Sequence, residues 1–502
     1  MEIKHAYETI VIGGGAAGLF FGAAAPSDWD ILILEKTKQT GTKLLMSGSG
    51  QCNLTHCGSI KEFLLCYGKN GNKIRTCLYR HSNLALCRFM EGLGVSLIER
   101  EDGKIFPRSM DAREVRGALL HACARNGVSI RTQAKVTAIC ALPQESGSSR
   151  VGSPAQPSCS QASAAAASDT DDATPGAQAD GDPAPGEKAQ FACAPDLGAR
   201  FVLTLADGTR LACRNLVIAA GGASYPTTGS DGTLLDVLAL APPAGLGLPI
   251  VPPRPALTPV CIENYPFADL AGISLRSVGL KIFPKLQSAA ADGQNSDMFA
   301  KKNKKAAKPQ TAVGDLLLTH KNLSGPVILN RSRDVFAGTR LEINFVFPYT
   351  VDSMISQIKE IFPGCRKMIS AYIGEEYHLP KRFVCRILEL IDLKDKPLAS
   401  LTGSEIRALS GAFAAWPCTV SGTGGYREAM ATAGGISLAA VDLSTMGCRT
   451  YPGLFFAGEV LDIDGDTGGY NLQFAYASAM AALDGIKGSR AKTYENTQKR
   501  GT

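Results

Sequence analysis

The segment that most constrains the fold lies near the N-terminus, where an apolar strand runs directly into a glycine-rich turn. Residues 7–12 are β-branched and apolar, and the turn Gly13-Gly14-Gly15-Ala16-Ala17-Gly18 follows them. Residues 16–25 are small and apolar, which is typical of a closely packed helix, and a second apolar run over residues 30–34 ends at Glu35. Strand, glycine turn, helix, strand and acid in this order predict a βαβ unit that binds a dinucleotide.

Each part of this unit has a physical role. Gly13 allows a tight turn, Gly15 lets a pyrophosphate approach the backbone, and Gly18 lets the helix pack closely on the sheet. The first helical N–H groups, at Ala16 and Ala17, lie at the positive end of the helix dipole and favour a phosphate. We expect Glu35 to accept hydrogen bonds from ribose hydroxyls. The alternative is a glycine-rich turn in an ordinary α/β core.

Composition indicates a globular protein without a nucleic-acid or membrane partner. The chain has 502 residues, 45% of them hydrophobic, and a net charge of only +6, which suggests about three domains. The lysine-rich run 301–305 has no interleaved aromatic residues, so we interpret it as a solvated loop. No signal peptide and no apolar run long enough to span a bilayer is apparent.

The cysteines point to a reducing compartment. There are 15 of them, scattered and without a C-x-x-C pair. This pattern is unlike a secreted disulfide framework, and it offers neither a dithiol centre nor an obvious zinc or iron–sulfur site. We therefore expect a cytoplasmic protein without a metal.

Two low-complexity stretches divide the chain. Residues 143–196 are rich in Ala, Ser, Pro, Gly and Asp and cannot bury enough apolar surface to fold. Strand-like runs at 134–140 and 199–205 flank this stretch, which predicts a long disordered loop within a β-meander that returns at 210–212. Residues 286–311 are interpreted in the same way, as the flexible loop of a hairpin.

The remaining patterns predict a domain that is interrupted in sequence. Residues 1–245 form its N-terminal part, and residues 436–502 complete it, with a buried strand at 454–459 and a helix at 470–482. Between them, short proline-punctuated strands at 246–350 and 411–435 predict a β-rich insert. Residues 351–410 have helical spacing and predict a small helical insert.

Five segments, in order along the chain, resemble the BaiN-like flavoproteins, a group within the FAD proteins with two dinucleotide-binding domains. They are Gly13–Gly18, Gly41–Asn53, Ala220–Ser230, Thr319–Pro326 and Phe456–Gln473. The resemblance covers nearly the whole chain outside the two loops. It implies an α/β protein with a Rossmann-like FAD-binding domain, a β-barrel-like insert, a small helical insert and bound FAD.

The resemblance and the chemistry of the residues together give a set of expected FAD contacts. Lys43 is expected at the pyrophosphate, Asn53 at the flavin edge, Asp462 at the ribityl hydroxyls, and Val136 at the adenine through its backbone. The N–H groups that open the helix after Gly469 are expected at the flavin pyrimidine oxygens. The full set is Gly13, Gly14, Gly15, Ala16, Ala17, Gly18, Glu35, Lys36, Lys43, Ser47, Gly48, Gly50, Cys52, Asn53, Val136, Gly221, Gly222, Gly458, Glu459, Asp462, Gly468, Gly469, Tyr470, Asn471 and Leu472.

Two details qualify this set. Ser49 and Gln51 stand where the family commonly has Gly and Arg, which removes one cation near the cofactor; the alternative for this Gly/Ser-rich run is a surface loop. The spacing of Asp462, Asp464 and Asp466 resembles a calcium loop, but a bidentate Glu does not follow at the required distance. We therefore expect no metal there.

The chain has one clear dinucleotide fingerprint, because the glycines at 422–425 do not follow a convincing buried strand. An NAD(P)H donor would therefore visit the same flavin face as the substrate.

The family includes reductases of 3-oxo bile acids and aminoacetone oxidases. The resemblance therefore implies an NAD(P)H-dependent reductase of a conjugated C=C bond in a steroid-like enone. Such an enzyme acts on CH–CH groups and takes an apolar small molecule. An oxygen-dependent amine oxidase is one alternative. A flavin-binding RNA-modification or regulatory protein is another, which the missing C-x-x-C and weak basic patches disfavour.

Reduction of an enone also needs a proton donor. Tyr225 and His320 lie in motif segments and could serve, although each could equally be structural, as a packed aromatic or a loop histidine. Tyr426 and Arg427 are further candidates for contact with substrate or flavin, and Trp416 is interpreted as structural.

Overall fold

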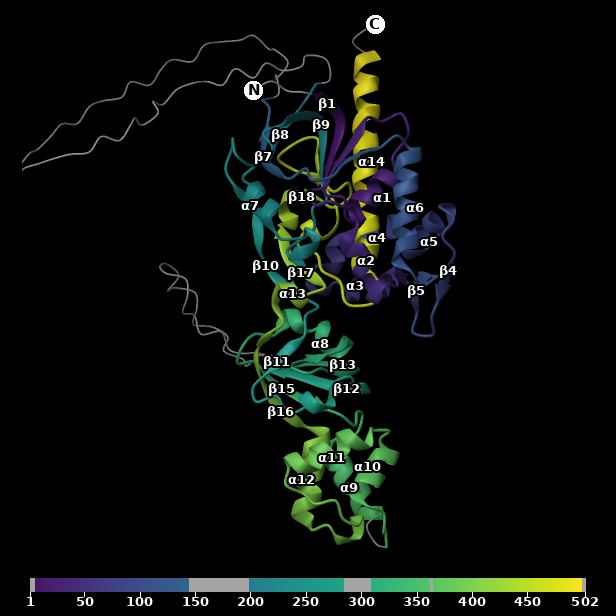
Figure 1. Cartoon of the computed structure of the whole chain (residues 1–502), viewed down its shortest axis with the longest axis vertical. Coiled ribbons are helices and arrows are strands. Elements are labelled where there is room, and N and C mark those ends of the chain that lie inside the picture. Colours follow the sequence, from purple (N-terminus) through teal and green to yellow (C-terminus); the bar gives the residue numbers. More distant parts are fainter. Residues whose placement is uncertain (1–4, 144–197, 284–307, 362–363, 499–502) are drawn as a thin grey trace, which may run out of the picture.

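A computed structural model describes residues 5–143, 198–283, 308–361 and 364–498, which form two units joined by a two-stranded ribbon (Figure 1). Both ends of the chain build the upper unit, and the middle of the chain builds the lower one. The loop predicted at 143–196 lies outside the described residues apart from Pro143, and so does most of the loop predicted at 286–311.

The upper unit is organised around a nine-stranded sheet. Its central strands pair in parallel and are buried on both faces; Ile10, Val11 and Val217 are fully buried. The main path of the sheet runs β18 (Val441–Asp442), β19 (Gly447–Cys448), β20 (Leu454–Phe456), β9 (Arg210–Ile218), β1 (His5–Ile12), β2 (Ile31–Leu34) and β6 (Ser129–Arg131).

The meander predicted after the first loop is partly wrong. Instead of a short return strand at 210–212, β9 is one continuous strand that ends at Ile218. Its first half pairs antiparallel with β8 (Phe201–Leu205), which pairs with β7 (Val136–Ala141), and it also pairs in parallel with β1. One strand can serve both pairings because each uses a different edge, which ties the hairpin rigidly to the core.

Helices cover this sheet. α1 (Ala16–Ala24) packs between α6 (Ala112–Arg125) and α14 (Tyr470–Gln498), the long C-terminal helix in Figure 1. α14 extends well beyond the predicted end at residue 482, because the residues that follow include good helix formers such as Lys, Arg and Ala. α7 (Thr233–Ala239) packs near β7.

A set of short elements between β2 and β6 was not predicted. They include a small antiparallel sheet in the order β3-β5-β4. Their apolar runs are too short for a clear period. The elements are α2 (Thr42–Met46), β3 (Thr55–His56), α3 (Ile60–Leu65), α4 (Arg75–Arg80), α5 (Asn83–Gly92), β4 (Leu97–Glu99) and β5 (Lys104–Pro107).

The ribbon leads into a closed barrel. β10 (Ile250–Ala256) and β17 (Ala431–Ile436) pair antiparallel and form the ribbon. The hairpin predicted around 286–311 is confirmed by the pairing of two barrel strands, β12 with β13. The barrel runs β11 (Val260–Ile262), β14 (Leu323–Ser324), β13 (Gln310–Leu318), β12 (Ser274–Phe283), β15 (Arg340–Asn344) and β16 (Trp416–Thr423). Beside it lie α8 (Pro326–Leu329) and α13 (Gly425–Glu428).

Four helices emerge between the neighbouring strands β15 and β16 and form the far end of the lower unit (Figure 1). They are α9 (Val351–Ile361), α10 (Ile369–Glu376), α11 (Lys381–Leu390) and α12 (Gly403–Ala414). Phe383 of α11 is fully buried, and its ring lies 4.8 Å from the ring of Phe345 beside the barrel. Barrel and helices therefore share one core, to which Trp416 belongs.

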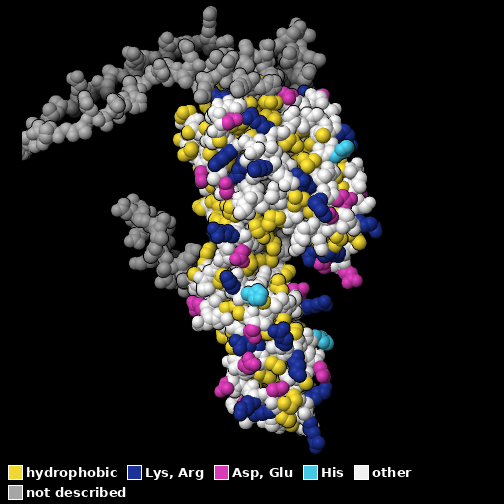
Figure 2. All heavy atoms as spheres, viewed as in Figure 1, with side chains coloured by type: hydrophobic (Ala, Val, Ile, Leu, Met, Phe, Trp, Pro, Cys, Tyr) yellow, Lys and Arg dark blue, Asp and Glu magenta, His cyan; other side chains and the backbone are white. Residues whose placement is uncertain are grey.

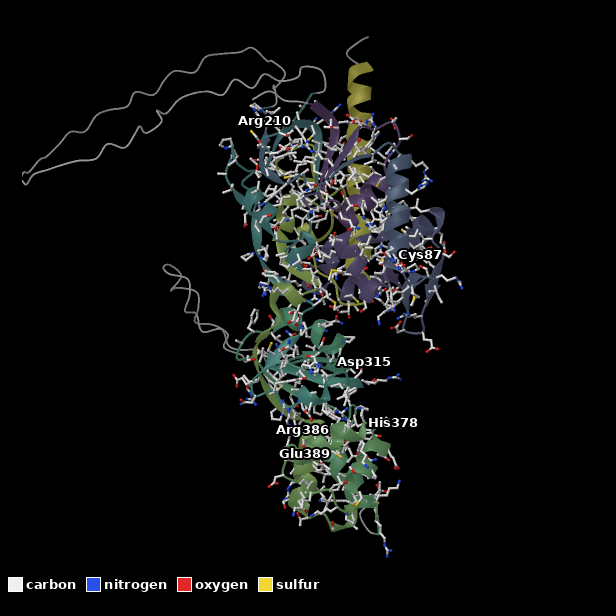
Figure 3. All side chains as sticks on the ribbon, viewed as in Figure 1. Cys87, Arg210, Asp315, His378, Arg386 and Glu389 are labelled. Atoms are coloured by element: carbon white, nitrogen blue, oxygen red, sulfur yellow. The ribbon has the colours of Figure 1, made fainter. Side chains whose placement is uncertain are left out.

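Polar contacts reinforce this junction. The guanidinium of Arg386 on α11 donates to the Pro266 carbonyl oxygen (3.0 Å) and pairs with Glu389, which lies beside it in Figure 3. The predicted α/β class, with an interrupted Rossmann-like domain, a barrel-like insert and a helical insert, is confirmed.

The viewed surface carries charge of both signs. Figure 2 shows Lys and Arg side chains spread over both units and interspersed with Asp and Glu. Over the ranges that the structure describes, every helix is too short or too polar to cross a membrane.

The shared core predicts a mechanical link between barrel and helices. Replacement of Phe383 by Ala should lower the free energy of unfolding by about 3–5 kcal/mol, since Phe383 also packs against Phe267 and Phe413. The exposed barrel residue Val313 is the control, and Val313→Ala should cost less than about 1 kcal/mol. Urea titration followed by circular dichroism measures both; equal midpoints for the two variants would contradict a common core.

Candidate active site

The site begins where four parallel strands end together. Ile12 of β1 lies opposite Leu34 of β2 and Ile218 of β9, and Ile218 lies opposite Phe456 of β20. The residues that follow these strands therefore meet at one edge of the sheet. A cavity of about 770 Å³ lies there, lined by Gly13, Glu35, Ala219 and Ala457 among others. This is where open α/β sheets place their ligands.

The three fingerprint glycines have different roles. A Cβ at Gly13 would overlap the Ala219 carbonyl oxygen, and one at Gly18 would overlap the Gly13 carbonyl oxygen, so both are needed for the turn itself. A Cβ at Gly15 would meet no described atom within 4 Å, and Gly15 lines the cavity. Gly15 thus leaves space in which a phosphate can approach the start of α1.

The start of α1 is suited to an anion. Within the described residues, no side chain caps this helix end, and its first turn has no acidic residue. The first N–H groups, at Ala16 and Ala17, border the cavity. Because such groups carry partial positive charge, they favour a pyrophosphate at this position.

Glu35 is fixed at the cavity wall by protein donors. Its Oε2 accepts from the Gly14 backbone N–H (3.0 Å), and its Oε1 accepts from the backbone N–H (2.8 Å) and hydroxyl (2.9 Å) of Thr37. A carboxylate has about four acceptor positions, so one remains for a ribose hydroxyl. Gly14 therefore acts through Glu35. Next to it, Lys36 lines the cavity in an ion pair with Asp231 (2.5 Å).

The N-terminus of α14 borders the same cavity from the other side. Gly468, Gly469, Asn471 and Leu472 line it. A Cβ at Gly469 would stand 2.6 Å from Thr55 Cα, so only glycine fits here. With its oxygen toward Gly469, the Asn53 amide accepts from the Gly469 N–H (3.2 Å) and donates to the Thr55 carbonyl oxygen (2.9 Å). Two helix N-termini from opposite ends of the chain thus face one space.

Lys43 is paired with protein groups. Its ammonium donates to Glu459 Oε2 (2.7 Å) and to the Ser224 hydroxyl, which donates to Glu459 Oε1 (2.7 Å). Burial disfavours the charged form of Glu459, but Lys43 and these hydrogen bonds outweigh it and hold its pKa below the ordinary value. The charge of the Lys43 ammonium, which was expected at the pyrophosphate, is therefore largely neutralised by Glu459.

Most residues expected to bind the cofactor line this cavity. They are Gly13, Gly15, Ala16, Ala17, Glu35, Lys36, Lys43, Ser47, Gly48, Asn53, Val136, Gly221, Gly222, Gly458, Glu459, Gly468, Gly469, Asn471 and Leu472, together with the candidate proton donor Tyr225.

The structure places the other expected residues away from the cavity lining. They are Gly14, Gly18, Gly50, Cys52, Asp462, Tyr470 and His320, as well as Tyr426 and Arg427. Most of these support the cavity wall, as Gly14 and Gly18 do; His320 instead lies in the barrel, in the turn between β13 and β14.

Three of these side chains make contacts away from the cavity lining. Asp462 turns toward the ribbon, where its Oδ1 accepts from the Gly434 N–H (3.1 Å). Tyr470 stacks on His56 with ring centroids 5.7 Å apart. Cys52 is fully buried, and burial raises the pKa of its thiol to about 12, so it is a neutral core residue.

Sequence reasoning missed a cation at this site. Arg100 lines the cavity, its guanidinium donates to Gln51 Oε1 (2.9 Å), and it lies 4.1 Å above the Phe106 ring. The hairpin of β4 and β5 therefore supplies a positive charge beside Gln51. No sequence signal pointed to this residue, because that hairpin was not predicted.

The backbone of the wall also marks this cavity as a site. Ser49, Tyr225 and Leu257 line it with positive φ angles of 57°, 53° and 53°. This conformation is strained for residues other than glycine and is common at functional sites.

The aspartates with calcium-like spacing do not converge: Asp464 and Asp466 flank Arg333 (2.7 Å from its Nη1 to Asp464), and Asp462 faces Gly434. Among the described residues no group of three metal-ligating side chains occurs.

The uncapped start of α1, the space at Gly15 and the fixed Glu35 carboxylate together fit FAD. Gly15→Ala would place a methyl group in that space, so we expect FAD affinity to fall at least about tenfold, or about 1.4 kcal/mol. The stability of the apoprotein should not change, because the position is otherwise open. Gly403→Ala, at an equally open position on α12, is the control. Fluorescence titration of the apoproteins with FAD measures the difference, and equal affinities would contradict this assignment.

Three proteins of assigned activity are similar to this chain over nearly its whole length. The ribosomal RNA dihydrouridine synthases of Haemophilus influenzae and Escherichia coli are each 26% identical; the matches cover 94% and 96% of this chain and 97% and 98% of those proteins. The 3-dehydro-bile acid delta(4,6)-reductase of Clostridium scindens is 25% identical, over 94% of this chain and 97% of that protein.

A family model, described as the HI0933-like protein Rossmann domain, matches residues 7–165 and 191–485. The match spans both parts of the interrupted domain and the insert between them, and it confirms the flavoprotein resemblance drawn from the five motifs. The chain therefore belongs to the HI0933-like family of FAD-dependent oxidoreductases.

Proposed function

We propose that this protein uses FAD to reduce a C=C bond conjugated to a carbonyl group, in a steroid-like enone such as a 3-oxo bile acid intermediate. The observation that carries the proposal is the cavity. It is one space bordered by two helix N-termini and, where the ribbon meets the barrel, by the apolar side chains of Leu257 and Met430. Such a wall suits a flat apolar substrate beside the flavin.

The relatives support this reaction class. A delta(4,6)-reductase of a 3-dehydro-bile acid saturates bonds conjugated to the 3-oxo group, and dihydrouridine differs from uridine by saturation of the C5=C6 bond, which is conjugated to the C4 carbonyl. Both products arise when a hydride adds to the β-carbon and a proton to the α-carbon. Bound FAD supplies the hydride once it is reduced.

The residues on the cavity wall suit these roles. The N-termini of α1 and α14 would hold the pyrophosphate and the flavin pyrimidine, and Glu35 would hold the ribose. Met46 and Met430 line the cavity with nearly half of each side chain exposed, and flexible thioethers adapt to apolar ligands of different shape.

NAD(P)H is the electron donor in this proposal. The glycines at 422–425 span the end of β16 and the start of α13, outside the cavity lining, and so do not form a second dinucleotide fingerprint. The nicotinamide would therefore occupy the substrate position before the enone does, in alternation.

Uridine in RNA is a second candidate substrate, because two relatives carry that activity in their names. Phosphate contacts from Lys and Arg would have to hold an RNA. Lys36, Lys43 and Lys104 line the cavity, but each is paired with a carboxylate, Asp231, Glu459 or Asp102 respectively. Arg100, which donates to neutral Gln51, and Lys135 also line the cavity, so it is the apolar wall of Leu257 and Met430 that favours a small apolar substrate.

Anaerobic stopped-flow measurements test the proposal. NADH or NADPH should bleach the flavin near 450 nm, and a 3-oxo-Δ4 steroid should then restore the colour with stoichiometric loss of the C=C bond. Recovery with oxygen alone, after reduction by an amine such as aminoacetone, would instead indicate an amine oxidase. Recovery with unmodified ribosomal RNA but with no steroid would indicate an RNA-modifying reductase and contradict the steroid assignment.

A further inference from the structure

One carboxyl group on the cavity wall is held differently from the others. Asp466 lines the cavity two residues before Gly468, and 21% of its side chain is exposed. Its Oδ1 pairs with Nη2 of Arg333, which lies in the turn 332–334 after α8. Asp466 therefore stands at the contact between the lower unit and the start of α14.

Arg333 is shared between two carboxylates. Its Nη1 lies 2.7 Å from Asp464 Oδ2 and donates to the Asp464 carbonyl oxygen (3.0 Å). Only 13% of the Arg333 and Asp464 side chains is exposed. Because Arg333 is shared between two partly buried carboxylates, each is compensated less than in a one-to-one pair, which favours a proton on one of them.

The surroundings of Asp466 set its protonation. Burial raises the pKa of Asp466 to about 6, although Arg333 and Arg331 oppose the shift and Asp464 and Asp334 support it. The ionisable side chains of Cys66 and Tyr470 also face it. Asp464 is equally confined, and burial raises its pKa too, but it does not line the cavity. A carboxyl with a pKa of about 6 is partly protonated near neutral pH, and of this pair it is Asp466 that lines the cavity.

The other acids on the wall are committed to fixed partners. Glu35 accepts three hydrogen bonds from protein donors, and Lys43 and Ser224 hold Glu459 ionised. Asp231 pairs with Lys36 and accepts from the Thr233 N–H (3.1 Å). Among the described residues, Lys36 and Lys43 each pair with a single carboxylate, unlike Arg333, and the pKa values of Asp231 and Glu459 lie below the ordinary carboxyl value.

The backbone around Asp466 is fixed from two sides. Its own N–H donates to the Cys66 carbonyl oxygen (2.8 Å), and the Thr467 N–H donates to Asn330 Oδ1 (2.8 Å). Asn330 and Arg333 both follow α8, so the lower unit holds this loop against the cavity. A proton donor held in this way keeps its position relative to a bound substrate.

We infer that Asp466 is the catalytic acid that protonates the α-carbon of the substrate, and this inference rests on the proposed reductase function. After the β-carbon has accepted a hydride, which brings both electrons, the substrate is an enolate. The O–H bond of Asp466 breaks, a C–H bond forms at the α-carbon, and the enolate oxygen becomes a carbonyl again. Arg333 stabilises the resulting carboxylate, which regains a proton from solvent.

The test compares Asp466→Asn with wild-type holoenzyme. Flavin reduction by NAD(P)H and reoxidation by ferricyanide should stay within about twofold, because neither step protonates carbon. Reoxidation by the enone should slow at least about 100-fold. The wild-type rate of that step should fall as the pH rises through about 6, since the donating form is the protonated one, and the variant should lose this dependence.

Two readouts do not depend on rate. In D2O the wild type should place deuterium on one face of the α-carbon, whereas Asp466→Asn should give both faces. Infrared difference spectra of the apoprotein should show a carboxyl that titrates near pH 6 in the wild type and is absent from the variant. Asp466→Glu should recover part of the rate. Asp464→Asn removes the neighbouring carboxylate that helps to raise the pKa of Asp466, so it should move the pH profile to lower pH while protonation stays on one face of the α-carbon.

The experiment separates a failure of the Asp466 role from a failure of the reductase function. Wild-type rates, pH profile and stereochemistry in Asp466→Asn would overturn the role of Asp466 and leave the reductase function intact. A wild-type flavin that steroid enones and RNA uridine both fail to reoxidise would overturn the reductase function, and the role of Asp466 with it.

Discussion

The architecture depends on the parallel pairing of β20 with β9. This pairing joins a strand from near the C-terminus to a strand that already pairs with β1. Without it, the segment after β20 would have no fixed position relative to the glycine turn. With it, Gly458 and Glu459 follow the carboxyl end of β20, and the N-terminus of α14 lies across the cavity from that of α1. More than four hundred residues of chain separate the two halves of one binding site.

Two helix N-termini around one cavity place partial positive charge on its wall, which favours an anionic ligand. The wall also carries lysine side chains, and two of them pair with carboxylates of the wall: Lys43 with Glu459 and Lys36 with Asp231. These pairs neutralise two of the cavity's cations, so around the glycine turn and the start of α14 the contacts open to an anionic cofactor are backbone N–H groups. Backbone donors need no side-chain ordering, which explains why glycine and alanine dominate the contact positions.

Sequence reasoning succeeded where local pattern determines structure. The strand, turn and helix over residues 5–24 depend on nearest neighbours, and their positions follow from the glycines and the apolar period. The motif residues after β20 were placed at the cofactor for the same reason. Asp462 was expected at the cofactor but does not line the cavity, because a carboxylate after a strand can face either side and here the Gly434 N–H of the ribbon holds it.

Long-range contacts account for the rest. Arg100 comes to Gln51 through a hairpin whose strands are too short to show a period. Lys43 was expected at the pyrophosphate, and its pairing with Glu459 was not foreseen because the two residues are distant in sequence. Likewise Asp466 was considered only as a calcium ligand, since its partner Arg333 belongs to the lower unit. A charge can be read from a sequence, but its compensation depends on tertiary contacts.

The lower unit reaches the cavity through few residues. Leu257 and Met430 lie where the ribbon enters the barrel, and Asn330 and Arg333 follow α8. Barrel and helices keep a core of their own, separate from that of the upper unit. Because this core is independent, substitutions at these few positions can alter the substrate side of the cavity without disturbing the cofactor side. Similar proteins over nearly the whole length carry names as different as a bile acid reductase and a ribosomal RNA dihydrouridine synthase, so specificity has to be argued from the residues at such a site and not from the fold.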